Sequence, residues 1–145
     1  MKAVIQRVKK ACVYVNKELI SQIETGLLVY LGIGKDSKEE DIDLLVKKIT
    51  EMRIFPDNEK EGVFSVRDIG GEILLISQFT LYGDVRKGRR PSFSEAMDVE
   101  NARLFYEKCL EKFKNSGVPT KSGVFQAMME IESINYGPYT IILEI

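Results

Sequence analysis

The chain has 145 residues, of which 44% are hydrophobic and 30% are charged, and its formal net charge is −1. This composition predicts one soluble domain over residues 1–145 with a buried core, and it argues against a general cationic coat for nucleic acid. No apolar run approaches the ~20 residues of a membrane span, and the N-terminus lacks the order of a secretory signal, so we expect a cytoplasmic protein.

The sequence contains no histidine and two cysteines, Cys12 and Cys109. The lack of histidine removes Ser-His and Cys-His nucleophile pairs in their usual form. It also removes most zinc sites, since two separated cysteines are a poor ligand set. Any catalysis is therefore expected to use hydroxyl groups, carboxylates, main-chain amides, lysine, arginine or the substrate itself, with neither a metal nor a cofactor.

The first part of the chain predicts strands and then a helix. β-rich segments predict strands over residues 1–8, 11–15, 18–23 and 27–33. Asn16-Lys17 is a plausible hairpin turn between two of them. Ser37 and Glu40 fit a capping box ahead of apolar residues at helical spacing, so we expect a helix that runs to about Arg53 and covers one face of the sheet.

Residues 73–81 predict a central strand that ends in polar side chains. Four consecutive aliphatic residues are typical of a strand buried on both faces. In an extended strand Ser77 and Phe79 would point to one face, and Gln78 and Thr80 to the other. Because a buried polar group without a partner costs about 1–3 kcal/mol, these side chains are expected either to cap the strand or to line a pocket.

A short strand over residues 63–67 precedes this one, and a cationic loop, residues 82–93, follows it. The loop carries Arg86, Lys87, Arg89 and Arg90. A loop of this kind is often only solvated, but beside a polar strand end anion binding becomes an equal alternative. The arrangement suits an anionic substrate with a polar reactive group.

The remaining sequence predicts a second helix and three strands. Asp98 can cap the helix. Its buried face is expected to comprise Ala102, Phe105, Tyr106, Cys109 and Phe113, which makes Cys109 a core residue rather than a nucleophile. Strands are expected over residues 121–125, 128–134 and 140–145, and Gly137-Pro138 is interpreted as a tight turn between the last two. A cis peptide bond there would turn two carbonyls in an unusual direction, where a ligand could meet them.

Three segments, residues 77–81, 87–93 and 135–140, together resemble the D-aminoacyl-tRNA deacylase family. The resemblance runs the full length of the chain and includes residues 5–8, 26–29 and 53–55. With the predicted elements, it implies one α+β domain with a mixed, barrel-like sheet and two main helices. It also implies an esterase that releases D-amino acids from tRNA as chiral proofreading in translation, working as a homodimer with its active sites at the subunit interface.

The resemblance implies that selectivity comes from main-chain shape. A cis peptide at Gly137-Pro138 would enter the partner's pocket, present carbonyls to the substrate α-amino group and leave no room for an L side chain. Arg7 would brace this loop. Because glycine has no side chain to reject, glycyl-tRNA mischarged on alanine tRNA is also an expected substrate.

The same resemblance gives catalytic roles to Ser77, Gln78, Phe79 and Thr80. An aminoacyl ester is already activated, so water or the ribose 2′-hydroxyl can attack if N–H groups near Phe79 and Thr80 polarise the carbonyl. Thr80 lacks an evident base, which favours a positioning role over a covalent nucleophile, although both readings remain open. Ser77 and Gln78 would hold the adenosine or the ester.

Aminoacylated tRNA is thus the implied partner. Phe125 and Met129 would wall the adenine pocket, with a plain core role as the alternative. The cations Arg86, Lys87, Arg89 and Arg90 would meet acceptor-stem phosphates without reading bases. Two departures from the family pattern, Met128 in place of an acid and Tyr139 in place of valine, support the alternative of a non-catalytic tRNA-binding dimer that keeps the fold.

Overall fold

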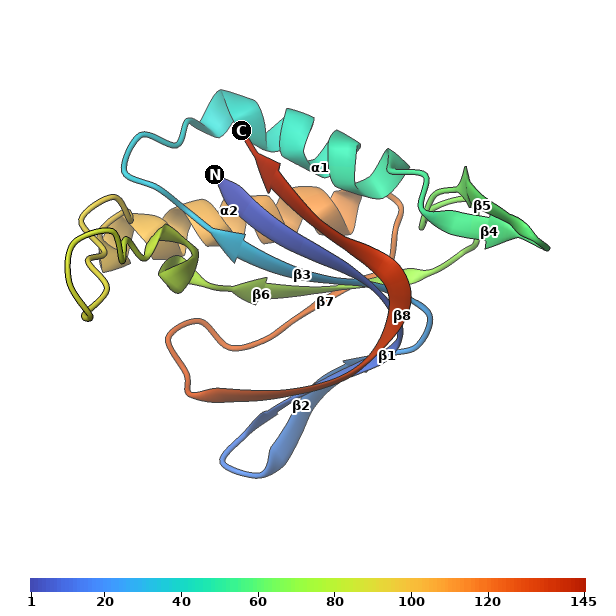
Figure 1. The fold of residues 1–145 in the computed structure, drawn as a ribbon, viewed down its shortest axis with the longest axis horizontal. Helices are drawn as coiled ribbons and strands as arrows, with labels where there is room; N and C mark the ends of the chain where they lie inside the picture. Colours follow the sequence, from blue (N-terminus) through green and yellow to red (C-terminus); the bar gives the residue numbers. More distant parts are fainter.

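A computed structural model describes residues 1–145 and confirms an α+β fold with two main helices (Figure 1). The strands are β1 (Lys2–Val15), β2 (Glu18–Ile23), β3 (Gly26–Gly32), β4 (Phe55–Asp57), β5 (Lys60–Phe64), β6 (Glu72–Ser77), β7 (Thr120–Ser122) and β8 (Met129–Glu144). The helices are α1 (Ile42–Glu51) and α2 (Val99–Asn115), and two short 3-10 turns are η1 (Glu39–Asp41) and η2 (Phe79–Tyr82). No helix combines the length and the apolar character needed to cross a lipid bilayer.

Strand β1 is the hub of a mixed, strongly curled sheet (Figure 1). The path β2-β1-β3-β6-β7 is extended by β8, which pairs with the other edge of β1 along most of its length. The pairings β1-β2, β1-β3 and β1-β8 are antiparallel, whereas β3-β6 and β6-β7 are parallel. Because β8 follows β1 through its bend, the sheet takes the barrel-like form that was expected.

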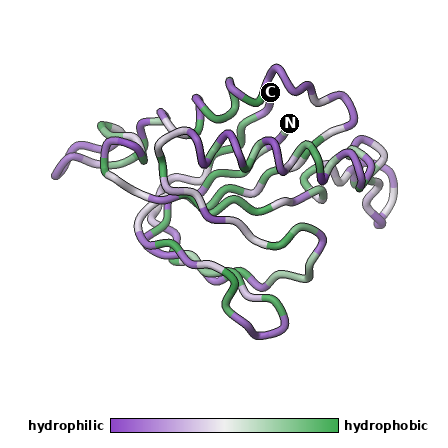
Figure 2. The backbone as a smooth tube through the Cα atoms, turned by 180° about the vertical axis from the view of Figure 1, so that it is seen from behind, coloured by the Kyte–Doolittle hydropathy of each residue, from purple (hydrophilic) through white to green (hydrophobic).

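Apolar residues on both faces of the sheet explain why β3 and β6 read as continuous hydrophobic runs. Leu27, Val29 and Leu31 belong to the larger core under the helices, whereas Leu28 belongs to a smaller core on the opposite face. The helices α1 and α2 lie side by side over the first face (Figure 1). The hydrophobic stretches in Figure 2 concentrate in the strands and in the loop between β7 and β8, whereas the β4-β5 hairpin is hydrophilic.

The helices form for the local reasons that their sequences indicate, with one correction. At α2 the Asp98 carboxylate accepts a hydrogen bond from the Asn101 N–H at 3.1 Å, which confirms the predicted cap. The predicted cap at Ser37 is wrong, because its hydroxyl instead accepts from the N–H of Gly34 and the helix begins through η1. The first helix also ends at Glu51, slightly earlier than predicted.

Several predicted strand boundaries differ because long-range pairing sets them. The segments expected as two strands at residues 1–8 and 11–15 form the single strand β1. Residues 60–64 rather than 63–67 form a strand, which pairs with β4 in a separate hairpin. Strand β7 covers only Thr120–Ser122, since its pairing with β6 ends at Ser122.

Candidate active site

The polar residues predicted for the central strand lie where β6 leaves the sheet. Strand β6 ends at Ser77, the Gln78 N–H donates to the carbonyl of Leu31 at 2.8 Å, and the chain then turns through η2. The prediction of a strand through residue 81 is therefore wrong in its last part. The cause is that the neighbouring β3 pairs with β6 only as far as Leu31, so the expected alternation of faces stops there.

Thr80 is exposed on η2 and has an amide for a partner. Its hydroxyl accepts a hydrogen bond from Nε2 of Gln78 at 2.5 Å. A side-chain amide does not take up a proton as a general base must, so this contact orients the hydroxyl without activating it. The N–H groups of Phe79 and Thr80 precede the first hydrogen bond of the turn, which runs from the Leu81 N–H to the Gln78 carbonyl, and they can donate outward.

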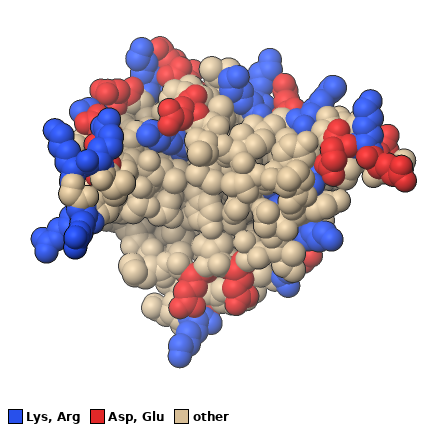
Figure 3. All heavy atoms as spheres, in the orientation of Figure 1, with Lys and Arg blue, Asp and Glu red and all other residues tan.

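The cationic loop lies directly beyond η2 and is not uniform in its charges. Arg86 is held by Asp84, with contacts of 2.9 Å from Nε and 2.8 Å from Nη2. The hydrogen bonds from the Arg86 side chain, and to a lesser extent the one from its main-chain N–H, lower the pKa of Asp84 to about 2. Lys87, Arg89 and Arg90 are exposed and form no ion pair within the chain, and Lys and Arg side chains gather at this end of the molecule (Figure 3).

Gly137 and Pro138 interrupt strand β8 instead of forming a turn between two strands. The peptide between them is cis, as the resemblance implied, but β8 runs from Met129 to Glu144 and pairs with β1 on both sides of them. The register passes from Val8 opposite residue 135 to Gln6 opposite residue 140, so residues 136–139 bulge out opposite Arg7. The predicted tight turn is therefore wrong, because β1 holds the two halves of β8 in one line. We call residues 135–139 the Gly-Pro loop.

Arg7 contacts the Gly-Pro loop through the bracing bonds that were expected. Its side chain has no solvent exposure. Nε donates to the carbonyl of Tyr136 at 2.8 Å, and Nη2 donates to the carbonyl of Gly137 at 2.6 Å. Nη1 donates to the carbonyl of Ile54 at 2.5 Å and to the carboxylate of Glu61 at 2.8 Å. One buried cation therefore ties the loop to the β4-β5 region.

Phe125 and Met129 lie beside the end of β6. The Gly123 N–H donates to the carbonyl of Leu75 at 3.2 Å, which brings residues 123–129 against this strand. A Cβ at Gly123 would stand 2.4 Å from Sδ of Met129, so a larger residue at this position would displace the Met129 side chain. Phe125 packs on the larger core and Met129 on the smaller one. Both are half-buried, which leaves each with a core contact and an accessible part.

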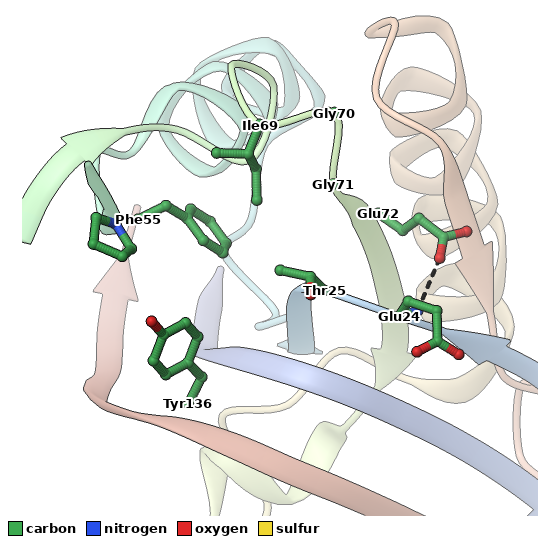
Figure 4. A pocket seen from close by; sticks show the side chains of 9 residues that line it. Glu24, Thr25, Phe55, Ile69, Gly70, Gly71, Glu72 and Tyr136 are labelled. Atoms are coloured by element: carbon green, nitrogen blue, oxygen red, sulfur yellow. Dashed lines mark hydrogen bonds between the residues drawn. The ribbon is translucent and has the colours of Figure 1, made fainter. Parts of the chain in front are cut away.

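A hollow of the surface lies elsewhere (Figure 4). It is lined by Glu24, Thr25, Phe55, Pro56, Ile69, Gly70, Gly71, Glu72 and Tyr136. Of the loop residues only Tyr136 reaches it, and none of residues 77–80 does. No cluster of three or more Cys, Asp or Glu side chains is arranged to hold a metal ion.

Within one chain the predicted catalytic and substrate-binding residues form two separate groups. The first comprises Ser77, Gln78, Phe79, Thr80, Phe125 and Met129 around the end of β6, and the second comprises Arg7, Gly137 and Pro138. Ser77 is opposite Leu31 and Leu31 is opposite Ala3, four residues along β1 from Arg7. With strand spacings of about 4.8 Å and a rise of about 3.3 Å per residue, the two groups lie on the order of 20 Å apart.

Four residues that touch these groups did not stand out in the sequence. Glu61 and Tyr136 contact Arg7, while Arg103 contacts Phe125 and donates a hydrogen bond to Gln126. Glu61 and Arg103 look like ordinary surface charges in a charged segment and a helix. Tyr136 and Gln126 carried a partial signal, since Tyr136 lies in the family-like segment 135–140 and Gln126 in a segment that departs from the family pattern. The left-handed φ of 65° at Gln126 is visible only in the structure.

Comparisons with known proteins agree on one family. A family model described as D-Tyr-tRNA(Tyr) deacylase matches residues 4–144. A protein named D-aminoacyl-tRNA deacylase from Dictyoglomus turgidum (strain DSM 6724 / Z-1310) is 53% identical over 144 residues, which cover 99% of this chain and 92% of the relative. A protein of the same name from Aquifex aeolicus (strain VF5) is 51% identical, with 99% and 97% covered.

Solved structures show the same fold. A structure described as c-Myc DNA Unwinding Element Binding Protein has a TM-score of 0.93 at 41% identity, covering 99% of this chain and 98% of the other. One described as a probable eukaryotic D-amino acid tRNA deacylase has a TM-score of 0.83 at 17% identity, with the same coverage. At that lower identity the likeness concerns the fold alone.

Proposed function

Because this chain belongs to the D-Tyr-tRNA(Tyr) deacylase family, we propose that it hydrolyses the ester bond between a D-amino acid and the terminal ribose of tRNA. The enzyme is then a carboxylic ester hydrolase, and aminoacylated tRNA is its partner. The observation that carries the choice of residues is the fixed, exposed main chain at Gly137, whose carbonyl is held by a fully buried arginine.

The active unit is a dimer with composite sites. The two groups of site residues are on the order of 20 Å apart in one chain, and neither group alone contains both ester-binding and chirality-selecting parts. In a twofold dimer the Gly-Pro loop of one protomer enters the site around Thr80 of its partner. The band without charged side chains across the middle of the face in Figure 3 supports such an interface, as do the exposed Ile134 and Ile142 on β8.

Chirality is selected by the carbonyls of the Gly-Pro loop. A carbonyl oxygen has two lone pairs, and Arg7 uses one on Gly137. The second lone pair and the carbonyl of Pro138 receive the α-ammonium group of the substrate. With the amino group held there, a D side chain points away from the loop and an L side chain collides with it. Glycine escapes this rejection, so glycyl-tRNA mischarged on alanine tRNA is also hydrolysed.

The chemical step needs no activated side chain. The N–H groups of Phe79 and Thr80 stabilise the oxyanion, and groups of this type contribute roughly 3–4 kcal/mol in other enzymes. Ser77 and Gln78 hold the ester or the adenosine, and Gln78 also orients the Thr80 hydroxyl through their 2.5 Å hydrogen bond. Phe125 and Met129 wall the adenine, while Arg86, Lys87, Arg89 and Arg90 meet the phosphates.

The first test compares hydrolysis of D-tyrosyl-tRNA and L-tyrosyl-tRNA by the same preparation. Hydrolysis of the D ester with the L ester preserved is expected, and equal rates or no hydrolysis would overturn the proposal.

Gly137→Ala should lower the rate of D-tyrosyl-tRNA hydrolysis by up to about 100-fold, since small misplacements at a reacting centre have effects of that size. The variant should fold, because its Cβ would meet no atom of its own chain closer than 3.9 Å. Glu132→Ala, also exposed on β8, is the control.

A mixing experiment tests the composite site. Gly137→Ala and Gln78→Ala each impair both sites of their own dimer. Co-refolding the two variants makes half of the dimers mixed, and each mixed dimer regains one unaltered site, so about a quarter of wild-type activity should return. Activity no higher than that of the separate variants would show that each site is built from one chain.

A Thr80→Ala variant tests the chemical step. It should retain substantial activity if water or the ribose hydroxyl attacks, because Thr80 then only positions the substrate. Complete loss, together with a trapped acyl-enzyme in the wild type, would instead identify Thr80 as the nucleophile.

A further inference from the structure

Two aromatic rings from the Gly-Pro loop contact the Arg7 guanidinium. Its central carbon lies 4.0 Å from the centre of the Tyr136 ring and 4.8 Å from the centre of the Tyr139 ring. A guanidinium directs its N–H bonds within its own plane. The four hydrogen bonds of Arg7 therefore fix it in that plane, and contacts with its faces resist motion out of it.

Tyr139 also connects Arg7 to the rest of the molecule. Its ring packs on the larger core, and its hydroxyl is next to β5, where a Cβ on Gly62 would stand 3.5 Å from it. The residue before Gly62 is Glu61, whose carboxylate is paired with Arg7. Tyr139 thus contacts the cation that holds the loop and lies beside the hairpin that supplies the cation's counter-charge.

We propose that Tyr139 is a positioning residue for chirality selection. Its ring confines the Arg7 guanidinium so that Nε and Nη2 stay directed at the carbonyls of Tyr136 and Gly137. This inference rests on the proposed function for its effect on selectivity, but its effect on Arg7 stands independently. The ring, and not the hydroxyl, contacts the guanidinium, so a phenylalanine at this position should confine Arg7 as well as tyrosine does.

The kinetic test measures the ratio of hydrolysis rates for D-tyrosyl-tRNA and L-tyrosyl-tRNA. Tyr139→Leu should lower this ratio about fivefold to tenfold, mainly by raising the L rate, since a looser loop admits the L side chain. Tyr139→Phe should stay within about twofold of the wild type. Tyr14→Leu is the matched control, because Tyr14 also contacts β8 from β1 but is paired with Glu132 away from Arg7.

A second measurement needs no substrate. The Nε–H of Arg7 is buried and hydrogen-bonded, so its exchange with solvent should be slow in the wild type and Tyr139→Phe and about fivefold or more faster in Tyr139→Leu. If Tyr139→Leu does not fold, Tyr139→Met provides a second residue without a ring, and its flexible side chain can fill the space that the ring leaves.

The outcomes separate the two claims. A wild type that does not prefer the D ester refutes the proposed function, and Arg7 exchange still decides whether Tyr139 confines the cation. A preserved D-to-L ratio and slow Arg7 exchange in folded Tyr139→Leu would overturn the inference. So would a loss in Tyr139→Phe equal to that in Tyr139→Leu.

Discussion

The guanidinium of Arg103 lies over the ring of Phe125, with 4.9 Å between its central carbon and the ring centre, and it also donates a hydrogen bond to Gln126. Tyr106 packs against the same ring with the two ring centres 5.7 Å apart. Helix α2 thus fixes the segment after β7 from two sides. Gln126 keeps a left-handed φ of 65° in this arrangement, a conformation that costs an L-residue about 1–2 kcal/mol.

Arg103→Ala should raise KM for D-tyrosyl-tRNA about fivefold and leave the D-to-L ratio unchanged. The variant loses a cation-π contact of about 1 kcal/mol and frees the segment that carries Phe125. Steady-state kinetics on both esters would check this. Lys108→Ala is the control. It removes one positive charge from the same helix, but Lys108 is paired with Glu39 and does not contact Phe125. An unchanged KM for Arg103→Ala would show that the segment that carries Phe125 does not contribute to substrate binding.

The cations of the loop should differ in their contribution to tRNA binding. Arg90→Ala should reduce the slope of log K against log salt by about 0.7–0.9, the loss of one phosphate contact. Arg86→Ala should reduce it less, because Asp84 already occupies Nε and Nη2 of Arg86. Binding of uncharged tRNA at several salt concentrations measures both slopes. Equal losses for the two variants would mean that the Asp84 contact opens in the complex.

The Asp84-Arg86 pair predicts a pH dependence at the acid end. The pKa of Asp84 falls from an ordinary 3.8 to about 2 in the folded chain. A carboxyl group whose pKa is lower in the folded than in the unfolded state stabilises the folded state. The full contribution is present above the pKa of the unfolded state, and it is lost as pH falls through the pKa of the folded state. The stability difference between wild type and Asp84→Asn should therefore be constant above pH 3.8 and shrink toward pH 2.

Carboxyl NMR titration should place the Asp84 midpoint near pH 2 in the wild type and move it back toward 3.8 in Arg86→Ala. A midpoint near 3.8 in both proteins would show that the pair does not persist in solution.

Lys17→Gly should stabilise the protein by about 0.5–1 kcal/mol without affecting activity. Asn16 and Lys17 form the β1-β2 turn with φ values of 51° and 68°, where glycine is free of the side-chain penalty. The greater freedom of glycine in the unfolded chain offsets part of the gain. Urea denaturation of both proteins measures the difference. Lys48→Gly, in an exposed position of α1, should instead destabilise by about 1 kcal/mol.

The sequence predicted elements whose signals are local. The aliphatic run at residues 73–76, the cap at Asp98 and the turn at Asn16 each depend on neighbours in the chain, and each is present. The strands of the sheet could also be predicted, because their hydrophobic patterns are local signals of the same kind. Their boundaries were less accurate, since those depend on where a partner strand ends.

The Gly-Pro loop shows what local reasoning misses. Gly137-Pro138 alone is typical of a tight turn, and only the pairing of β8 with a strand more than a hundred residues earlier keeps both halves in line. The contacts of Arg7 were equally hidden. The resemblance named Arg7 as a brace, but Ile54, Glu61 and Tyr139 join it through folding of three distant segments.

The pairing of the first strand with the last has a consequence for biosynthesis. Lys2 of β1 is opposite Glu144 of β8, so the edge of β1 stays open until β8 has been synthesised. Such a high contact order slows folding and leaves an unpaired edge exposed in the nascent chain. A chain whose synthesis stops before Met129 would therefore be prone to aggregation, and the Gly-Pro loop takes its place against Arg7 only after β8 has been made.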